Sequence, residues 1–228
     1  MIIAFNQMKL KINTILFDLD GTLTNPKEGI VNSILYALGK LGIKENFVNE
    51  LDSFIGPPLR DSFIKRYNLT DKLADKAVIS YREYFAIKGL FENEMYPGAE
   101  EMLESFCTKK YQLFVATSKP TTYSERILKH FRLDKFFIEI VGSNLDNTRT
   151  DKTEIISHII TSHNLMAANS IMVGDRKHDI TGAKNNLIKS VGVTYGYGSL
   201  EELRSAQAEF IVNDFVELKT LFSDLQKE

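Results

Sequence analysis

Short runs of β-branched and aromatic residues alternate with helical patterns through most of the chain. Turn residues bound each run, as is typical of buried strands. Between residues 97 and 195 we expect strands at 112–116, 137–141, 170–173 and 190–193, separated by helices at 99–106, 122–131, 153–163 and 180–187. One more strand, at 14–17, comes far earlier. Because such alternation implies a parallel sheet with helices on both faces, we predict an α/β fold with a doubly wound, Rossmann-like sheet.

The segment between the first strand and the rest of the predicted sheet shows helical periodicity alone. Gly56-Pro57-Pro58 interrupts this pattern and Tyr96-Pro97-Gly98 ends it. We therefore expect an all-α domain at residues 25–96, inserted into an α/β core domain that comprises residues 1–24 and 97–228. The two apolar stripes of the insertion are Ile30, Ile34, Leu38 and Leu41, and Leu73, Ala77, Tyr81, Tyr84 and Phe85.

Composition and charge exclude several classes of protein. The 228 residues carry a formal net charge of −2 with both signs scattered, so we expect no broad surface for nucleic acid or an anionic membrane. The single cysteine, Cys107, excludes an internal disulfide and suits a reducing compartment. The apolar start is too short for a signal peptide, and no apolar run is long enough to span a membrane. We expect a cytoplasmic protein, either a monomer or a small homo-oligomer.

An acidic pair follows the first predicted strand. Asp18 and Asp20 come directly after the run Ile15-Leu16-Phe17, and Gly21 allows a sharp turn behind them. In open α/β sheets, ligands bind at the carboxyl ends of the strands, which is where Asp18 falls. An Asp-x-Asp-Gly sequence alone is often a solvated turn. An EF-hand would need further ligands, and a Walker-B aspartate would need a phosphate-binding glycine loop that this chain lacks.

Three later sites strengthen the functional interpretation. The strand at 112–116 runs into Thr117-Ser118-Lys119, and the strand at 170–173 runs into Gly174-Asp175, with Asp179 four residues further on. Lys152 opens the helix that follows the strand at 137–141. Any one of these polar residues could be a helix cap or a loop residue. Four such sites in this order predict a ligand site at one edge of the sheet.

These motifs together resemble the haloacid dehalogenase superfamily. Its motifs are DxDGT, a hydrophobic strand ending in Thr or Ser, a lysine, and GDxxxD. They correspond here to Asp18-Leu19-Asp20-Gly21-Thr22, Thr117, Lys152, and Gly174-Asp175 with Asp179. The insertion after the first motif resembles the helical cap of the phosphoglycolate-phosphatase-like branch. The stretch before Lys152 lacks the prolines common in that family, which bears on the subgroup alone.

The acidity of this site calls for a cation. Four carboxylates beside a phosphate ester would repel it, and Lys152 supplies a single positive charge. An oxygen-rich site of this kind suits Mg²⁺. From the resemblance we assign Asp18, the backbone carbonyl of Asp20 and Asp175 as metal ligands. Asp179 would act through water or by orienting Lys152.

The resemblance also implies catalytic roles. Asp18 would attack phosphorus and form an aspartyl-phosphate, and Asp20 would serve as general acid and base. We expect the phosphate oxygens to be held by Gly21, Thr117, Ser118 and Lys152. Arg60, next to the Gly56-Pro57-Pro58 loop, is a candidate for a second substrate anion or else a surface arginine. Arg149 and Lys119 are further candidates.

Several functions share this motif set. The leading interpretation is a phosphatase that acts on phosphoglycolate or similar small phosphate monoesters. Alternatives are a 5′-nucleotidase, suggested by the Arg149-x-x-Lys152 spacing, a β-phosphoglucomutase-like phosphomutase, and a non-catalytic phosphate-binding protein. The four histidines form no metal-binding pattern, and we expect His178 to face solvent. Gly196-Tyr197-Gly198 is interpreted as a turn near the rim of the site.

Overall fold

A six-stranded parallel sheet forms the centre of the molecule. The structure is a computed structural model that describes residues 12–146 and 148–227. The strand order is β5-β4-β1-β6-β7-β8, and all pairings are parallel. This confirms the predicted doubly wound α/β fold. The strands are β1 (Thr14–Phe17), β4 (Gln112–Pro120), β5 (Glu139–Ser143), β6 (Ser170–Gly174), β7 (Lys189–Val193) and β8 (Phe210–Val212).

The central strand β1 shows why the sheet is covered on both faces. Successive side chains of a strand point to opposite faces. Ile15 and Phe17 belong to the larger apolar cluster, whereas Leu16 belongs to the smaller one, and all three are fully buried. The larger cluster includes residues of α4 (Ala99–Thr108), α5 (Thr121–His130) and α9 (Phe215–Asp224). The smaller cluster includes residues of α6 (Lys152–Ser162) and α7 (Lys177–Asn185).

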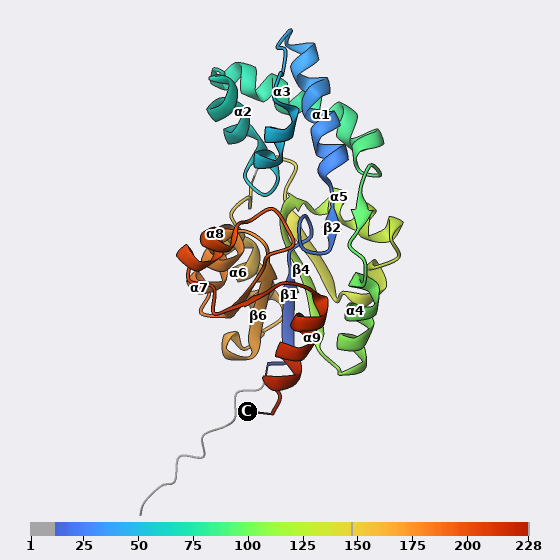
Figure 1. Ribbon diagram of the computed structural model, residues 1–228, viewed down its shortest axis with the longest axis vertical. Helices are drawn as coiled ribbons and strands as arrows, with labels where there is room; N and C mark the ends of the chain where they lie inside the picture. Colours follow the sequence, from blue (N-terminus) through green and yellow to red (C-terminus); the bar gives the residue numbers. More distant parts are fainter. Residues whose placement is uncertain (1–11, 147, 228) are drawn as a thin grey trace, which may run out of the picture.

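The helical segment between β1 and α4 lies beyond the carboxyl ends of the strands (Figure 1). It contains α1 (Lys27–Lys40), the 3₁₀-helix η1 (Val48–Phe54), α2 (Leu59–Tyr67), α3 (Asp71–Tyr84) and the π-helix η2 (Phe85–Gly89). We call residues 25–96 the cap. Where the chain enters and leaves the cap, β2 (Thr24–Asn25) and β3 (Glu94–Met95) form a two-stranded antiparallel sheet. The exact division into domains at residues 25 and 96 stays a prediction.

Some elements differ from the sequence expectations. The strand expected at 137–141 lies at 139–143, because Phe137 ends the short 3₁₀-helix η3 (Asp134–Phe136). The elements β8, α8 (Leu200–Ser205) and α9 had not been predicted. On α3, Leu73 was placed on the apolar stripe but is exposed, since the buried face begins at Ala74. Within residues 12–146 and 148–227, no helix has both the length and the apolar character of a membrane span.

Candidate active site

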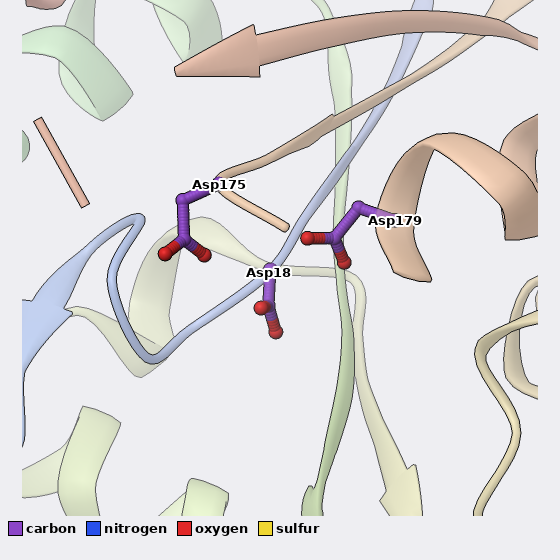
Figure 2. Close-up of side chains that lie close together, drawn as sticks. All are labelled: Asp18, Asp175 and Asp179. Atoms are coloured by element: carbon purple, nitrogen blue, oxygen red, sulfur yellow. The ribbon is translucent and has the colours of Figure 1, made fainter. Parts of the chain in front are cut away.

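Three carboxylates meet at the carboxyl edge of the sheet. Asp18 follows β1, Asp175 follows β6, and Asp179 lies in the first turn of α7. One oxygen of each lies within 4.8 Å of the others, and all three residues are buried. Figure 2 shows the three side chains converging from the two neighbouring strand ends and the helix. The adjacency of β1 and β6 in the sheet therefore brings the first and the fourth motif together.

Lys152 lies against two of these carboxylates. Its Nζ is 2.9 Å from Oδ1 of Asp18 and 2.7 Å from Oδ1 of Asp179. It also donates a hydrogen bond to the Ala116 carbonyl at 2.9 Å. Burial alone would lower the pKa of Lys152, but the charges of Asp179 and Asp18 raise it above its ordinary value. The ammonium group is therefore held in its charged form between the two carboxylates.

Lys152 owes its position to the start of α6. Asp151 is the N-cap of this helix, and its Oδ1 accepts a hydrogen bond from Thr153 N at 2.7 Å. Ser, Thr, Asp and Asn are favoured at such positions because their side chains satisfy the first free N–H groups of a helix. This N-cap places Lys152 in the first turn of α6, where its side chain reaches the Ala116 carbonyl of β4.

Asp175 carries the least compensated charge of the three. It is fully buried, and its Oδ2 accepts a hydrogen bond from Tyr197 N at 2.7 Å. Its Oδ1 has no hydrogen-bond partner among the described residues. Burial, together with the charges of Asp179 and Asp18, raises the pKa of Asp175 well above its ordinary value. A cation beside Oδ1 would remove this cost, because buried charges are stable only when paired or bound to metal.

Gly21 leaves the space that Asp175 occupies. Its φ is +84°, and a Cβ at this position would lie 2.3 Å from Oδ2 of Asp175. Glycine alone combines this backbone conformation with the required room. The residues at this edge thus fit a divalent cation. The donor atoms are oxygens, and Oδ1 of Asp175 is buried without a partner among the described residues. The three carboxylates also outnumber the single ammonium group of Lys152.

Asp20 lies apart from the three clustered carboxylates. Its Oδ2 forms an ion pair with Lys119 Nζ at 2.8 Å, and both side chains are largely buried. Lys119 Nζ also lies 4.7 Å from the centre of the Phe85 ring, which belongs to the cap. Burial raises the pKa of Asp20 despite the opposing charge of Lys119. Asp20 is therefore easier to protonate than an ordinary aspartate, as a general acid requires.

The second motif lies beside Asp18, as the adjacency of β1 and β4 requires. Thr117 is 2% exposed, and its Oγ1 accepts a hydrogen bond from Lys119 N at 3.3 Å. The carbonyl of Ser118 accepts a hydrogen bond from Ser143 Oγ at 2.9 Å. Thr117 and Ser118 line the same cavity as Asp18 and Lys152. Their contacts with a phosphate stay a prediction.

A cavity of about 460 Å³ lies between this edge of the sheet and the cap. At the edge of the sheet, Asp18, Asp20, Asp179 and Lys152 line it. Its walls are largely apolar or aromatic and are contributed by both the cap and α5. These wall residues include Phe54, Leu59, Val78, Tyr81, Phe85 and Tyr123.

The two arginines proposed from the sequence occupy different places. Arg60 lines the cavity, but its guanidinium pairs with Asp71 and Asp75, each at 2.7 Å. Arg149 does not belong to the described lining of the cavity, and its Nε donates to the Gly142 carbonyl at 3.1 Å. The structure thus assigns Arg60 a partner within the cap and Arg149 a partner in the loop after β5. Substrate contacts by either residue stay predictions.

Three residues around the site make contacts that sequence reasoning did not predict. Arg176 lines the cavity and contacts the cap. Its position inside the fourth motif could have indicated that it lies near the site. His178 was expected to face solvent, but it lines the cavity and is half-buried. Burial lowers the pKa of His178, so the neutral imidazole is favoured. Tyr197 holds Asp175 through its backbone N–H, a role that no side-chain pattern announces.

A comparison with known families agrees with this geometry. The family model described as haloacid dehalogenase-like hydrolase matches residues 15–193. The chain is a haloacid dehalogenase-like hydrolase. The match runs from β1 to the end of β7 and includes Asp18, Thr117, Lys152 and Asp175. The resemblance seen in the sequence motifs is thereby confirmed.

Several relatives of this hydrolase are phosphatases. A 5′-nucleotidase from Pseudomonas aeruginosa is 45% identical over 210 residues, which cover 92% of this chain and 95% of the relative. A phosphoglycolate phosphatase from Vibrio parahaemolyticus is 28% identical over 215 residues, which cover 91% and 94%. The crystal structure of a predicted phosphatase from Clostridium acetobutylicum has a TM-score of 0.91 and 45% identity, covering 94% of this chain and 99% of that one. The hydrolase is accordingly a phosphoric monoester hydrolase.

Proposed function

We propose that this hydrolase is a magnesium-dependent phosphatase that cleaves small phosphate monoesters through a phospho-aspartate on Asp18. The observation that carries the proposal is the placement of the Asp18 carboxylate. It lies on the floor of the cavity, 2.9 Å from Lys152 Nζ and beside two further buried carboxylates. A carboxylate held between a cation and a ligand cavity is suited to nucleophilic attack.

The proposed metal ligands are Asp18, the backbone carbonyl of Asp20 and Asp175. Asp179 contacts Lys152 at 2.7 Å and accepts a hydrogen bond from Arg176 N at 3.0 Å, so it would orient the lysine and support the metal ligands. When bound, Mg²⁺ supplies the positive charge that lets an anionic ester approach these carboxylates.

The first chemical step forms the covalent intermediate. An Asp18 carboxylate oxygen attacks phosphorus, and the bond from phosphorus to the ester oxygen breaks. Asp20, whose pKa is raised by burial, would donate a proton to the leaving alkoxide. Gly21, Thr117, Ser118 and Lys152 would hold the remaining phosphoryl oxygens, and this stabilisation of spread charge dominates phosphoryl transfer.

The second step releases phosphate. Water attacks phosphorus of the aspartyl-phosphate, and the bond from phosphorus to the Asp18 oxygen breaks. Asp20, now ionised, takes a proton from this water and returns to its starting state. The products are inorganic phosphate and the alcohol, and both carboxylates are ready for another cycle. The cap would exclude bulk water from these steps.

The cavity favours a second candidate substrate class over phosphoglycolate. A substrate carboxylate would need a cation near the cap. Of the cap arginines that line the cavity, Arg60 is engaged by two aspartates, and Arg82 donates a hydrogen bond to the Leu145 carbonyl. The apolar and aromatic walls instead suit an uncharged ring system, such as the nucleoside of a nucleoside 5′-monophosphate. The similarity to a 5′-nucleotidase supports the same choice.

A Mg²⁺-dependent substrate screen tests the proposal. Phosphoglycolate, sugar phosphates, nucleoside monophosphates and p-nitrophenyl phosphate are compared by phosphate release. We expect Asp18→Asn to lose activity by about 10³-fold or more on every substrate. Asp151→Asn, which changes an exposed aspartate next to Lys152 and keeps a good N-cap, is the matched control. Wild-type turnover by Asp18→Asn would exclude the phospho-aspartate.

Two outcomes of the same screen separate the alternatives. Phosphate release without a bisphosphate activator counts against a phosphomutase. Absence of hydrolysis of every ester would return the hydrolase to the phosphate-binding class. A crystal soaked with Mg²⁺ and beryllofluoride should carry the phosphate mimic on the Asp18 carboxylate.

A further inference from the structure

Arg176 joins the acidic loop of the core to a loop of the cap. Its guanidinium Nη1 donates a hydrogen bond to the backbone carbonyl of Ile55, which precedes Gly56-Pro57-Pro58. Its own backbone N–H donates to Oδ2 of Asp179 at 3.0 Å, and it directly follows Asp175. One residue thus touches both the wall of the cavity above the site and the carboxylates below it.

The side chain of Arg176 is held from its other side by Glu202. Its Nε donates to Oε1 of Glu202 at 2.9 Å, and the Arg176 side chain is 14% exposed. Glu202 belongs to α8 and also accepts a hydrogen bond from Lys177 N at 2.9 Å. The carboxylate is therefore fixed by the core, and it directs the free edge of the guanidinium toward the cap. A lysine lacks this planar fork and could not serve both partners in the same geometry.

The cap loop is shaped to receive this side chain. Gly56 has a φ of +102°, and a Cβ there would lie 3.1 Å from both Cγ and Nη1 of Arg176. Gly56, Pro57, Pro58 and Leu59 all line the cavity. The glycine therefore allows the cap backbone to rest directly on the arginine side chain. The acceptor is a backbone carbonyl, so no cap side chain reveals the contact in the sequence.

A second arginine, which belongs to the cap, donates a hydrogen bond to a backbone carbonyl of the core. Arg82 of α3 in the cap donates from Nη1 to the Leu145 carbonyl in the loop after β5 of the core, at 2.9 Å. Both Arg82 and Arg176 line the cavity. Among the described residues, cap and core are thus joined by two arginine-to-carbonyl hydrogen bonds that originate from opposite sides of the interface.

We propose that Arg176 is a positioning residue that docks the cap loop at residues 55–59 over the phosphate site. The docked loop completes the wall that a substrate's leaving group contacts. The catalytic consequence rests on the proposed phosphatase function, but the docking itself does not. Loss of the guanidinium would leave the acidic groups in place and release the cap loop.

A distance measurement in the substrate-free protein tests the docking. Fluorophores are attached to Lys72→Cys in the cap and Ser205→Cys in the core, both exposed, in a Cys107→Ala background. We expect Arg176→Gln to lower the ratio of docked to undocked cap by about tenfold, as loss of one charge-assisted hydrogen bond would. Arg176→Lys should give an intermediate ratio. Arg204→Gln, which removes an exposed arginine of the same α8 neighbourhood, should match wild type.

Kinetics add a readout that a merely structural role would not move. For the best nucleoside monophosphate, Arg176→Gln should raise KM by about tenfold, while kcat/KM for acetyl phosphate, which is too small to reach the cap loop, should change by less than about twofold. Thermal unfolding shows that each variant is folded. An unchanged cap distance in Arg176→Gln would overturn the proposal, and so would an equal loss on both substrates. Because the distance needs no substrate, its outcome is independent of the proposed phosphatase function.

Discussion

At the scale of single residues, the two aspartates of the first motif are separated by the cations they meet. Asp18 pairs with Lys152 at the carboxylate cluster, whereas Asp20 pairs with Lys119 beneath the cap. Asp18 and Asp20 are only two residues apart, but they meet different lysines because β4 and α6 each place one lysine at the same edge of the sheet. The proposed nucleophile and the proposed general acid thus lie in different electrostatic environments.

Replacing Asp20 tests its role in proton transfer. Asp20→Asn should lower the turnover of an ester with a poor leaving group by about 10²- to 10⁴-fold, since the leaving alkoxide then has no proton donor. Turnover of p-nitrophenyl phosphate, whose leaving group needs little protonation, should fall much less. Stopped-flow and steady-state phosphate assays on both esters provide the comparison. Equal losses on the two esters would contradict the assignment.

Glu45 stabilises the cap through a pH-dependent pair with Arg66. Its Oε2 accepts a hydrogen bond from Arg66 Nε at 3.0 Å, and this contact lowers the pKa of Glu45 to about 2. A depressed carboxyl pKa contributes stability above the unfolded value, and this contribution is lost as pH falls toward the folded value. Glu45→Gln should therefore destabilise the protein by about 2 kcal/mol at pH 7.

The pH series supplies the check on Glu45. Urea unfolding of wild type and Glu45→Gln is compared at pH 7, 5 and 3. The difference in free energy of unfolding should stay constant down to about pH 5 and shrink between about pH 4.5 and pH 2. A difference that grows on acidification would have the wrong sign and would exclude this account.

At the scale of elements, the start of the last helix, α9, is stabilised by the N-cap residue Asp214. Asp214 Oδ1 accepts hydrogen bonds from Val216 N and Glu217 N, both at 2.8 Å. The helix then buries Phe215, Leu218 and Phe222 against the larger apolar cluster. Helix ends leave four N–H groups without intrahelical partners, so this side chain replaces water for two of them.

Removal of the Asp214 N-cap should have a measurable effect on the free energy of unfolding. Asp214→Ala is expected to lower the free energy of unfolding by about 1 kcal/mol. Asp224→Ala, an exposed substitution at the other end of α9, should change it by less than about 0.5 kcal/mol. Chemical denaturation of both variants provides the values, and phosphatase activity should be unaffected in each. Equal stability of Asp214→Ala and wild type would show that packing alone positions α9.

At the scale of the whole molecule, the proposed metal binding would be linked to stability through the buried carboxylates. Asp18 lies far along the chain from Asp175 and Asp179, and folding brings an oxygen of each within 4.8 Å of the others. The unfolded chain has no such site, so the proposed Mg²⁺ would bind the folded state and stabilise it. Without a metal, the burial of Asp175 and its repulsion by Asp179 and Asp18 oppose folding, since both raise the pKa of Asp175.

Thermal unfolding with and without Mg²⁺ tests this linkage. At a Mg²⁺ concentration of about 100 Kd, wild type should gain about 2.7 kcal/mol, or about 5–10 °C in Tm. Asp175→Asn should gain far less, and without metal it should be at least as stable as wild type because one buried charge is gone. NaCl at the same ionic strength is the control. An equal Mg²⁺ effect on both proteins would place the metal elsewhere.

Much of this organisation follows from the sequence alone. Strand–helix alternation predicted the parallel sheet, and Asp18, Thr117 and Asp175 lie at or near the carboxyl ends of β1, β4 and β6, so their shared edge was foreseeable. The short β8 and the helix α9 were missed because three residues of strand and one half-exposed helix give weak patterns. The helical character of the cap was also evident from periodicity, apart from the position of Leu73.

The sequence by itself determined which groups gather at the edge of the sheet, since parallel strands end on the same side whatever their distance along the chain. The tertiary structure decided which partner each charged group meets. Arg60 pairs within the cap, Lys119 pairs with Asp20, and Arg176 donates to a cap carbonyl. Long side chains reach whichever partner the packed elements bring near, and a backbone acceptor leaves no trace in the sequence. These contacts are therefore set by the packing of the cap against the sheet and not by any sequence pattern.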